Sequence, residues 1–331
     1  MLPGSIQMSG ETLSGAEVKG VCEGLTEGTV RLLSLRGCLL SDRDFARLCQ
    51  GVAQSPSLVQ LNLNLGVVSS ASRVQQLAQS LHKNRSLQSL FLHGNPLTDT
   101  GLALLNPALA GHPSLVSLDL GDCLLGDEGI SLICSLLPPD GAKPADGSTG
   151  WKKRVGGQAP PHYNVRKRAY AGLRELTLSA NPAITCTGWA RLAVAVAHSS
   201  QVRTLNLDYN PLGDHIASML AVCVASSRTL EILDLEGTGL SNLSAQILLD
   251  MIQNYPTPLR NLVLSENNIS VELQQQIADL LSEGEDEDES EGPGQDPPIR
   301  EKGLKSNLGP GPHRVLLTSG LGDSLLAETE M

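Results

Sequence analysis

The sequence predicts an α/β solenoid, an arc in which parallel strands line the concave face and helices cover the convex face. One template recurs eight times between residues 30 and 282, with an aliphatic residue at its start and leucines three and five residues later. Within each copy the apolar spacing changes from the alternation of a strand to the three-and-four spacing of a helix. Aromatic residues make up only 2% of the chain, so the core must be aliphatic.

The clearest copy runs from Leu87 to Leu97, with leucines at offsets 0, 3, 5 and 10 and Asn95 at offset 8. A single copy cannot bury its own apolar side, whereas stacked copies bury a continuous column of leucines. Each buried leucine then contributes about 1.5–3 kcal/mol. Neighbouring copies start 28 or 29 residues apart, except for one interval of 58, which is one period plus an insertion. The copies start at Val30, Leu58, Leu87, Leu115, Leu173, Val202, Leu230 and Leu259.

Offset 8 lies where the chain leaves each strand, and it is asparagine or cysteine in six copies. An asparagine amide at this point can satisfy backbone groups of its own turn and of the neighbouring repeat. We therefore predict a ladder of side chains that joins the repeats. Its members are Cys38, Asn95, Cys123, Asn181, Asn210 and Asn267, whereas Gly66 and Thr238 depart from the pattern.

This pattern resembles the leucine-rich repeat family, and within it the ribonuclease-inhibitor type. The long period, the choice of asparagine or cysteine at offset 8 and a helix in every unit carry the resemblance. It extends over residues 30–282, which is most of the chain. The resemblance implies a protein made of repeats alone, with no attached catalytic domain.

Residues 1–29 are predicted to form an N-terminal cap that closes the exposed end of the leucine columns. A short helix is expected from Ser14 to Leu25, because Ser14 and Glu17 have the spacing of a capping box. Pro107 lies inside the expected helix of the third copy, so we predict a kink or an early stop near Asn106.

Residues 142–171 interrupt the repeats, and we predict a disordered basic loop between the fourth and fifth copies. The segment holds seven basic residues and one acidic residue, and no leucine occurs between Leu137 and Leu173. Its two basic clusters, 152–154 and 166–168, are spaced like a two-part nuclear import signal. A solvated basic loop explains the same residues, so a cytoplasmic and a nuclear location both stay open, as does an optional exon.

Residues 283–331 are predicted to be a disordered acidic tail, because seven of the first nine residues are acidic. Leucines return between Val315 and Met331, where the chain either folds as a short helix on a partner or stays mobile.

Composition excludes several classes of function. The net charge is −11, and the repeats themselves are acidic, which argues against nucleic acid and favours a basic protein partner. No apolar run is long enough to span a membrane, and no signal peptide is apparent, so we expect a cytosolic or nuclear monomer. Neither the seven cysteines nor the seven histidines have the spacing of metal ligands. No catalytic or phosphate-binding motif is present, so we expect no enzyme activity, metal or cofactor.

The predicted concave face is the place where function is expected. Offsets 2, 4 and 6 point outward from each strand, with offset 7 at the rim, and an outward aromatic beside charges is typical of an interface anchor. The outward set also includes Arg36, Asn62, Asn64, Asn206 and Glu266. The residues predicted to bind a partner are Phe91, His93, Asp119, Asp122, Asp208, Tyr209, Asp234 and Glu236.

These observations favour a non-catalytic scaffold that binds one protein through its concave face. The alternative is a regulator of a small GTPase, because the arc and the acidic tail also resemble the GTPase-activating protein of Ran. That family's functional residues find no match in this chain. An inhibitor of a secreted-type ribonuclease is a third reading, but the repeats offer few aromatic anchors for it.

Overall fold

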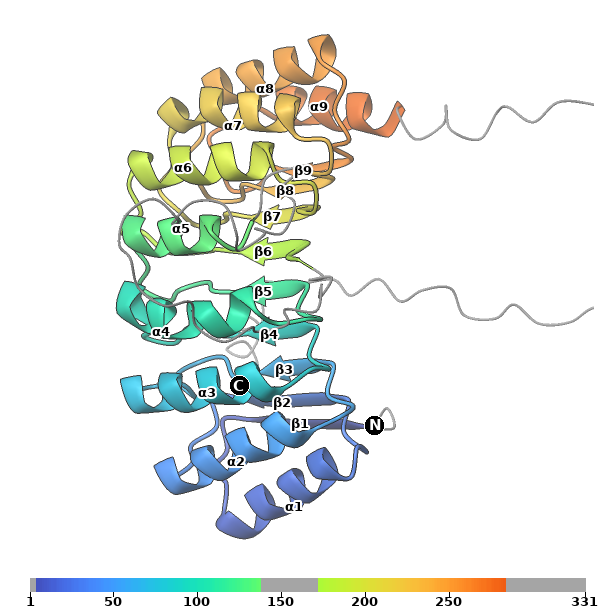
Figure 1. The fold of residues 1–331 in the computed structure, drawn as a ribbon. Helices are drawn as coiled ribbons and strands as arrows, with labels where there is room; N and C mark the ends of the chain where they lie inside the picture. Colours follow the sequence, from blue (N-terminus) through green and yellow to red (C-terminus); the bar gives the residue numbers. More distant parts are fainter. Residues whose placement is uncertain (1–3, 138–171, 284–331) are drawn as a thin grey trace, which may run out of the picture. The chain divides into compact units, whose positions relative to one another are not determined.

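The computed structural model describes residues 4–137 and 172–283, which form one layer of parallel strands packed against one layer of helices (Figure 1). The strands follow chain order from β1 to β9 in a single sheet, which confirms the predicted α/β solenoid. The strands are β1 Ser5–Ser9, β2 Leu32–Arg36, β3 Gln60–Asn62, β4 Ser89–Phe91, β5 Ser117–Asp119, β6 Glu175–Thr177, β7 Thr204–Asn206, β8 Ile232–Asp234 and β9 Asn261–Val263. The helices are α1 Gly15–Thr26, α2 Asp42–Gln54, α3 Ala71–Lys83, α4 Thr98–Ala110, α5 Asp127–Cys134, α6 Cys186–Ala197, α7 Asp214–Ser226, α8 Asn242–Asn254 and α9 Val271–Glu283.

The leucines of the template form the core between the two layers. In the copy that contains β4, Leu87, Leu90 and Leu92 are fully buried, and Leu102 of α4 is buried opposite them. Equivalent leucines of every described repeat join one apolar cluster. The repeats therefore stack as their spacing predicts, because each one completes the core of its neighbour.

The sheet continues across the long interval between the fourth and fifth copies. Strands β5 and β6 pair in parallel, with Leu118 opposite Leu176. The columns therefore pass from one copy to the next although 58 residues separate their starts. The predicted basic loop, 142–171, and the predicted tail, 283–331, lie outside the described residues apart from the end of α9.

The N-terminal segment adds a strand that the sequence analysis did not predict. Strand β1 pairs in parallel with β2, and helix α1 follows it, so residues 5–26 have the same strand–helix order as a repeat. The predicted capping box is present, because the Ser14 side chain accepts from the Glu17 N–H and the Glu17 carboxylate accepts from the Ser14 N–H. The strand was missed because its residues lack the leucine spacing of the template.

Of the kink or early stop predicted near Asn106, the early stop is wrong. Helix α4 continues through Pro107 to Ala110. Proline removes one N–H, whose partner would have been the carbonyl of Ala103, but this happens only one turn before the helix ends. The buried side chains of Ala108 and Leu109 hold that last turn against the core.

The four offset-8 asparagines and Cys123 connect consecutive repeats through buried or partly buried hydrogen bonds. The Asn210 amide donates to the Leu178 carbonyl of the preceding repeat at 2.9 Å and to its own Leu207 carbonyl at 2.9 Å, and its oxygen accepts from the Asn181 N–H at 2.7 Å. Asn95, Asn181 and Asn267 make equivalent contacts, while Cys123 and Thr238 donate to the Leu92 and Leu235 carbonyls. Because these backbone groups are out of reach of water, the side chains replace the hydrogen bonds that water would make.

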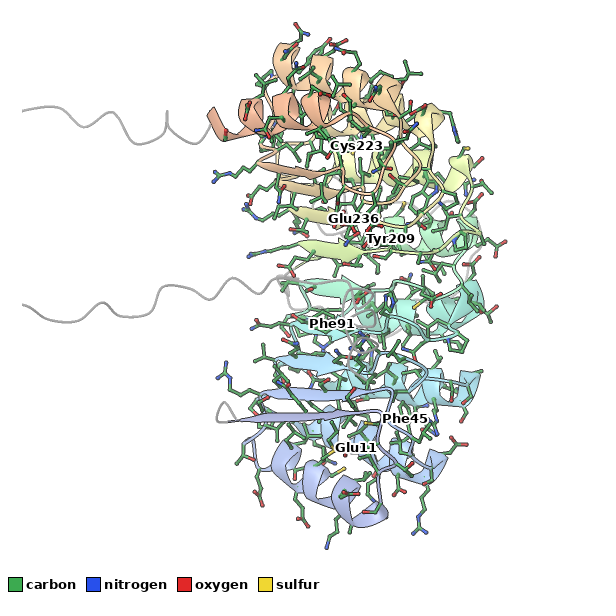
Figure 2. The ribbon with its side chains drawn as sticks, turned by 180° about the vertical axis from the view of Figure 1, so that it is seen from behind. Glu11, Phe45, Phe91, Tyr209, Cys223 and Glu236 are labelled. Atoms are coloured by element: carbon green, nitrogen blue, oxygen red, sulfur yellow. The ribbon has the colours of Figure 1, made fainter. Side chains whose placement is uncertain are left out.

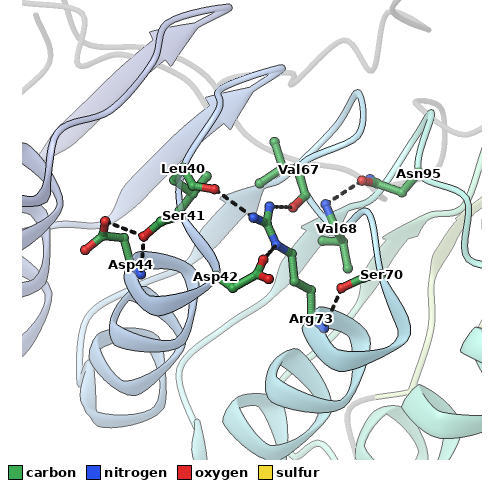
Figure 3. A network of polar contacts seen from close by, with 9 residues as sticks. All are labelled: Leu40, Ser41, Asp42, Asp44, Val67, Val68, Ser70, Arg73 and Asn95. Atoms are coloured by element: carbon green, nitrogen blue, oxygen red, sulfur yellow. Dashed lines mark hydrogen bonds and ion pairs between the residues drawn. The ribbon is translucent and has the colours of Figure 1, made fainter.

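Arg73 connects the first and second repeats where Gly66 replaces asparagine, although it binds other carbonyls than a ladder amide does (Figure 3). Its guanidinium donates to the Leu40 carbonyl of the first repeat at 2.7 Å and to the Val67 carbonyl of the second at 2.8 Å. It also lies 2.8 Å from the Asp42 carboxylate, and its charge lies 5.1 Å from the Phe45 ring centroid. The side chain is 9% exposed, so a buried cation joins these two repeats.

A second ladder runs along the N-termini of the helices, at the first helical residue or the residue after it, which lies twelve residues after the starts of the third, fourth, sixth and seventh repeats. Carboxylates or an amide at this position accept from the backbone N–H at the start of the following helix. Asp99 accepts from Gly126 at 2.8 Å, Asp127 from Thr185 at 2.8 Å, Asp214 from Ser241 at 2.9 Å and Asn242 from Ser270 at 2.7 Å. Hydrogen bonds from Ser241 and Ser244 lower the pKa of Asp214 to about 2. This ladder was not predicted, although aligning the copies at that offset shows its residues.

Replacing Asn210 by alanine should lower the free energy of unfolding by about 2–4 kcal/mol, because a buried N–H and two carbonyls lose their partners. Urea denaturation followed by circular dichroism measures this loss. The matched control is Asn268→Ala, which truncates an exposed asparagine directly after Asn267, the last residue of the ladder. Equal midpoints for the two variants would contradict a stabilising ladder.

Arg73→Met should lower the free energy of unfolding by about 2–4 kcal/mol, since two buried carbonyls are left without donors. Arg47→Met removes a half-exposed arginine that pairs with Asp44 on the same helix, and its cost should be below about 1 kcal/mol. Thermal unfolding measures the stability of both variants. If Arg73→Met lowers the free energy of unfolding no more than Arg47→Met does, Arg73 does not stabilise the contact between the two repeats.

Candidate functional site

One row of side chains crosses the outer face of the sheet at offset 4 of the successive repeats. The strand register places Phe91 beside Asp119, and Asn206 beside Asp234. Going from β3 to β8, the row reads Asn62, Phe91, Asp119, Thr177, Asn206 and Asp234. Because neighbouring parallel strands lie about 4.8 Å apart, each of these side chains contacts the next.

Asparagine and aspartate in this row hold the end of the strand. The Asp119 carboxylate accepts from the Gly121 N–H at 2.9 Å, and the Asp234 carboxylate accepts from the Glu236 N–H at 3.0 Å. Asn206 makes the same bond to the Asp208 N–H at 2.8 Å, as Asn62 does to the Asn64 N–H at 3.0 Å. An uncharged amide therefore serves this local purpose as well as a carboxylate does.

The sequence-based prediction that Phe91 is an exposed anchor is wrong. Its side chain is only 8% exposed, and His93 is only 7% exposed. The His93 ring fills the space over Gly121, where a β-carbon would clash with it. Side chains on a concave sheet converge, so neighbouring strands cover a large ring that offset counting assigns to solvent.

Three carboxylates gather where β5, β7 and β8 end. Burial and the charge of Asp208 raise the pKa of Asp119, while the Gly121 N–H and the charge of His93 lower it, and the net direction is upward. Burial, together with the charges of Asp208 and Glu236, raises the pKa of Asp234 to about 6. Asp208 itself is 1% exposed and acts on both neighbours. Ionisation of Asp119 and of Asp234 is therefore less favourable in this cluster than in water.

Tyr209 extends this negative region towards the last repeats (Figure 2). Its hydroxyl lies 2.6 Å from the Glu236 carboxylate and 3.1 Å from the Glu266 carboxylate. Hydrogen bonding to Glu236, burial and the two negative charges raise the pKa of the Tyr209 phenol. Ser265 also donates to Glu236, at 2.9 Å. The neutral phenol donates to these carboxylates but brings no positive charge to them.

The structure thus brings together five of the eight predicted binding residues: Asp119, Asp208, Tyr209, Asp234 and Glu236. Asp122 is exposed and has a left-handed backbone, with φ 46°, beside the row. Over residues 4–137 and 172–283, no group of three or more metal-ligating side chains comes together. Within the same residues, no helix combines the length and apolarity needed to cross a bilayer.

Asp234→Asn should stabilise the protein at pH 7.5 by on the order of 1 kcal/mol and have no effect near pH 4. The ordinary pKa of 3.8 is raised to about 6 on folding, so the folded state binds this proton more tightly. The stability that the carboxyl contributes is complete below about pH 4 and is lost as the pH rises through about 6. The amide keeps the bond to the Glu236 N–H but carries no charge.

Urea denaturation at several pH values, with wild type and variant compared at each, measures this difference. Glu11→Gln removes one charge from an exposed side chain outside the cluster and serves as the control. A constant difference between wild type and Asp234→Asn from pH 4 to pH 7.5 would contradict the raised pKa.

Comparison with known proteins agrees with this architecture. A family model described as Leucine Rich repeat matches residues 83–105, 111–134 and 198–221. The chain is 64% identical to leucine-rich repeat-containing protein 73 of Homo sapiens over 343 aligned residues, which cover 100% of both chains. It is 26% identical over 281 residues to the ribonuclease inhibitor of Mus musculus, covering 83% of this chain and 61% of that protein.

Among solved structures, the Rad7 and Elc1 complex in yeast gives a TM-score of 0.47 at 17% identity, covering 79% of this chain and 60% of that one. The predicted family is confirmed by the match along the whole length of the human relative and by the stacked leucine columns. The chain belongs to the leucine-rich repeat family.

Proposed function

We propose that this protein is a non-catalytic scaffold whose strand face binds a basic segment of a partner protein. The observation that carries the proposal is the choice of aspartate at positions 119 and 234. Asn62 and Asn206 make the same strand-end hydrogen bond without a charge. The fold therefore does not require the charge, which at Asp234 opposes folding at neutral pH. A destabilising charge on a binding face is explained by a cationic partner.

A bound lysine or arginine would offset the repulsion that disfavours the ionised carboxylates of this face. A cation beside Asp119 and Asp234 favours their ionised forms and lowers the pKa of both. It also offsets the effect of the Asp208 and Glu236 charges, both of which raise the pKa of Asp234. Arginine suits this surface best, because its planar donors can engage two carboxylates together.

The partner-facing surface we propose is the row from Asp119 to Asp234 together with Tyr209, Glu236 and Glu266. Tyr209 supplies an aromatic ring that is half-buried, which makes it the candidate anchor in place of the covered Phe91. The proposed face includes no metal or cofactor. None of the described residues favours regulation of a small GTPase over simple binding.

A matched pair of triple variants tests this proposal. The strand-face variant combines Asp234→Asn, Glu236→Gln and Glu266→Gln. The control variant removes the same number of charges from the helices, with Glu128→Gln, Asp250→Asn and Glu272→Gln, all of which are exposed. Each protein is immobilised, and the proteins it retains from a cell extract are quantified by mass spectrometry at 50 mM and 300 mM salt, both of which are chosen to bracket ionic screening.

The strand-face variant should retain basic partners at least tenfold less than wild type, while the control variant retains them fully. High salt should weaken the wild-type complexes, since the proposed attraction is ionic. Retention that is unchanged by the strand-face variant, or lost equally in the control, would overturn the assignment. A GTP hydrolysis assay with any small GTPase among the partners separates binding from activation.

A further inference from the structure

Cys186 and His215 form a thiol–imidazole pair on the opposite, helical side of the molecule. Cys186 is the first residue of α6, and its Sγ lies 2.8 Å from the Nε2 atom of His215 in α7. Both side chains are exposed. A thiol with an imidazole nitrogen in hydrogen-bond reach has a base to which its proton can pass, and the thiolate that remains is the nucleophilic form.

The position of Cys186 shows that the fold does not need this pair. It is the first helical residue of its repeat, where Asp127 and Asp214 of other repeats accept from the start of the next helix. Cys186 makes no such bond: the Gly213 N–H at the start of α7 donates to the Thr238 carbonyl instead, at 3.1 Å. The helix N-terminal ladder is therefore interrupted here, and a reactive pair stands in its place.

A groove between α5 and α6 leads to the thiol. It has a volume of about 740 Å³, and its lining includes Cys186, Cys134, Arg191 and Ser131. The Arg191 guanidinium donates to the Ser131 hydroxyl at 3.0 Å, which holds its positive charge on the groove wall. The Asp127 carboxylate, at the start of α5, accepts from the N–H and the hydroxyl of Thr185. The groove offers room, apolar contact and one cation to a small molecule that approaches the thiol.

We propose that Cys186 and His215 form a thiol–disulfide exchange site for small anionic disulfides, with Arg191 attracting their carboxylates. The Cys186 thiol passes its proton to His215, and the thiolate attacks one sulfur of the incoming disulfide. A bond between Sγ and that sulfur forms while the disulfide bond of the reagent breaks. The departing thiolate takes the proton from His215 and leaves as a thiol. Cys186 is oxidised to a mixed disulfide, and the other half of the reagent is reduced.

Glutathione disulfide is the probe, and mass spectrometry of digested protein follows each cysteine in the same reaction. Cys22 and Cys134 are the internal controls, because both are partly exposed and burial raises the pKa of each thiol. Cys186 should be modified at least tenfold faster than either at pH 7. His215→Ala should slow the modification of Cys186 about tenfold, while His198→Ala, at the other end of α6, leaves the rate unchanged.

Arg191→Gln separates the role of the groove from that of the pair. It should slow the reaction of Cys186 with glutathione disulfide severalfold but leave its reaction with the neutral bis(2-hydroxyethyl) disulfide unchanged. Circular dichroism melting of each variant verifies that the exposed substitutions leave the fold intact. The proposal is overturned if His215→Ala reacts as fast as wild type, or if Arg191→Gln slows both reagents equally.

Discussion

Every repeat must satisfy backbone groups that its neighbour has sealed away from water, and the rest of this structure depends on that constraint. Stacking buries the leucines, but it also buries the turn at the end of each strand. A carbonyl left there without a donor costs about 1–3 kcal/mol, which is comparable to what one leucine contributes. The Asn210 amide meets this need in two adjacent repeats at once. The ladder is therefore a condition for stacking and not an addition to it.

The exceptions to the ladder show that the requirement concerns hydrogen bonds and not the identity of the residue. Thr238 donates from its hydroxyl and Cys123 from its thiol. Where Gly66 offers no side chain, Arg73 reaches from the helix of the same repeat to carbonyls of two repeats. Burying a cation costs desolvation free energy. The Asp42 carboxylate and the Phe45 ring beside the Arg73 guanidinium offset part of this cost.

Since the inner side of each strand and its turn carry the stability, the outer positions are free to serve binding. The offset-4 residue still has one local task, which either asparagine or aspartate performs. Choosing aspartate at 119 and 234 therefore changes the charge of the face without changing the fold. The same freedom exists on the helical side, where Cys186 occupies a position that the ladder fills elsewhere and leaves a thiol beside His215.

The sequence by itself determined the eight leucine-containing repeats, their order, their strand and helix segments, and the asparagine positions at the strand ends, but not strand β1 of the N-terminal segment. These features follow from spacing within about thirty residues. The apolar periodicity and the hydrogen bonds that the turn after each strand requires are both set within one repeat. Only the tertiary structure decided that Phe91 and His93 are covered, that burial and the charge of Asp208 raise the pKa of Asp119 and Asp234, and that Arg73 joins two repeats. Those facts depend on side chains one or two repeats apart and on how closely a concave sheet brings them together. Spacing along the chain predicts neither these contacts between repeats nor the distances between the side chains.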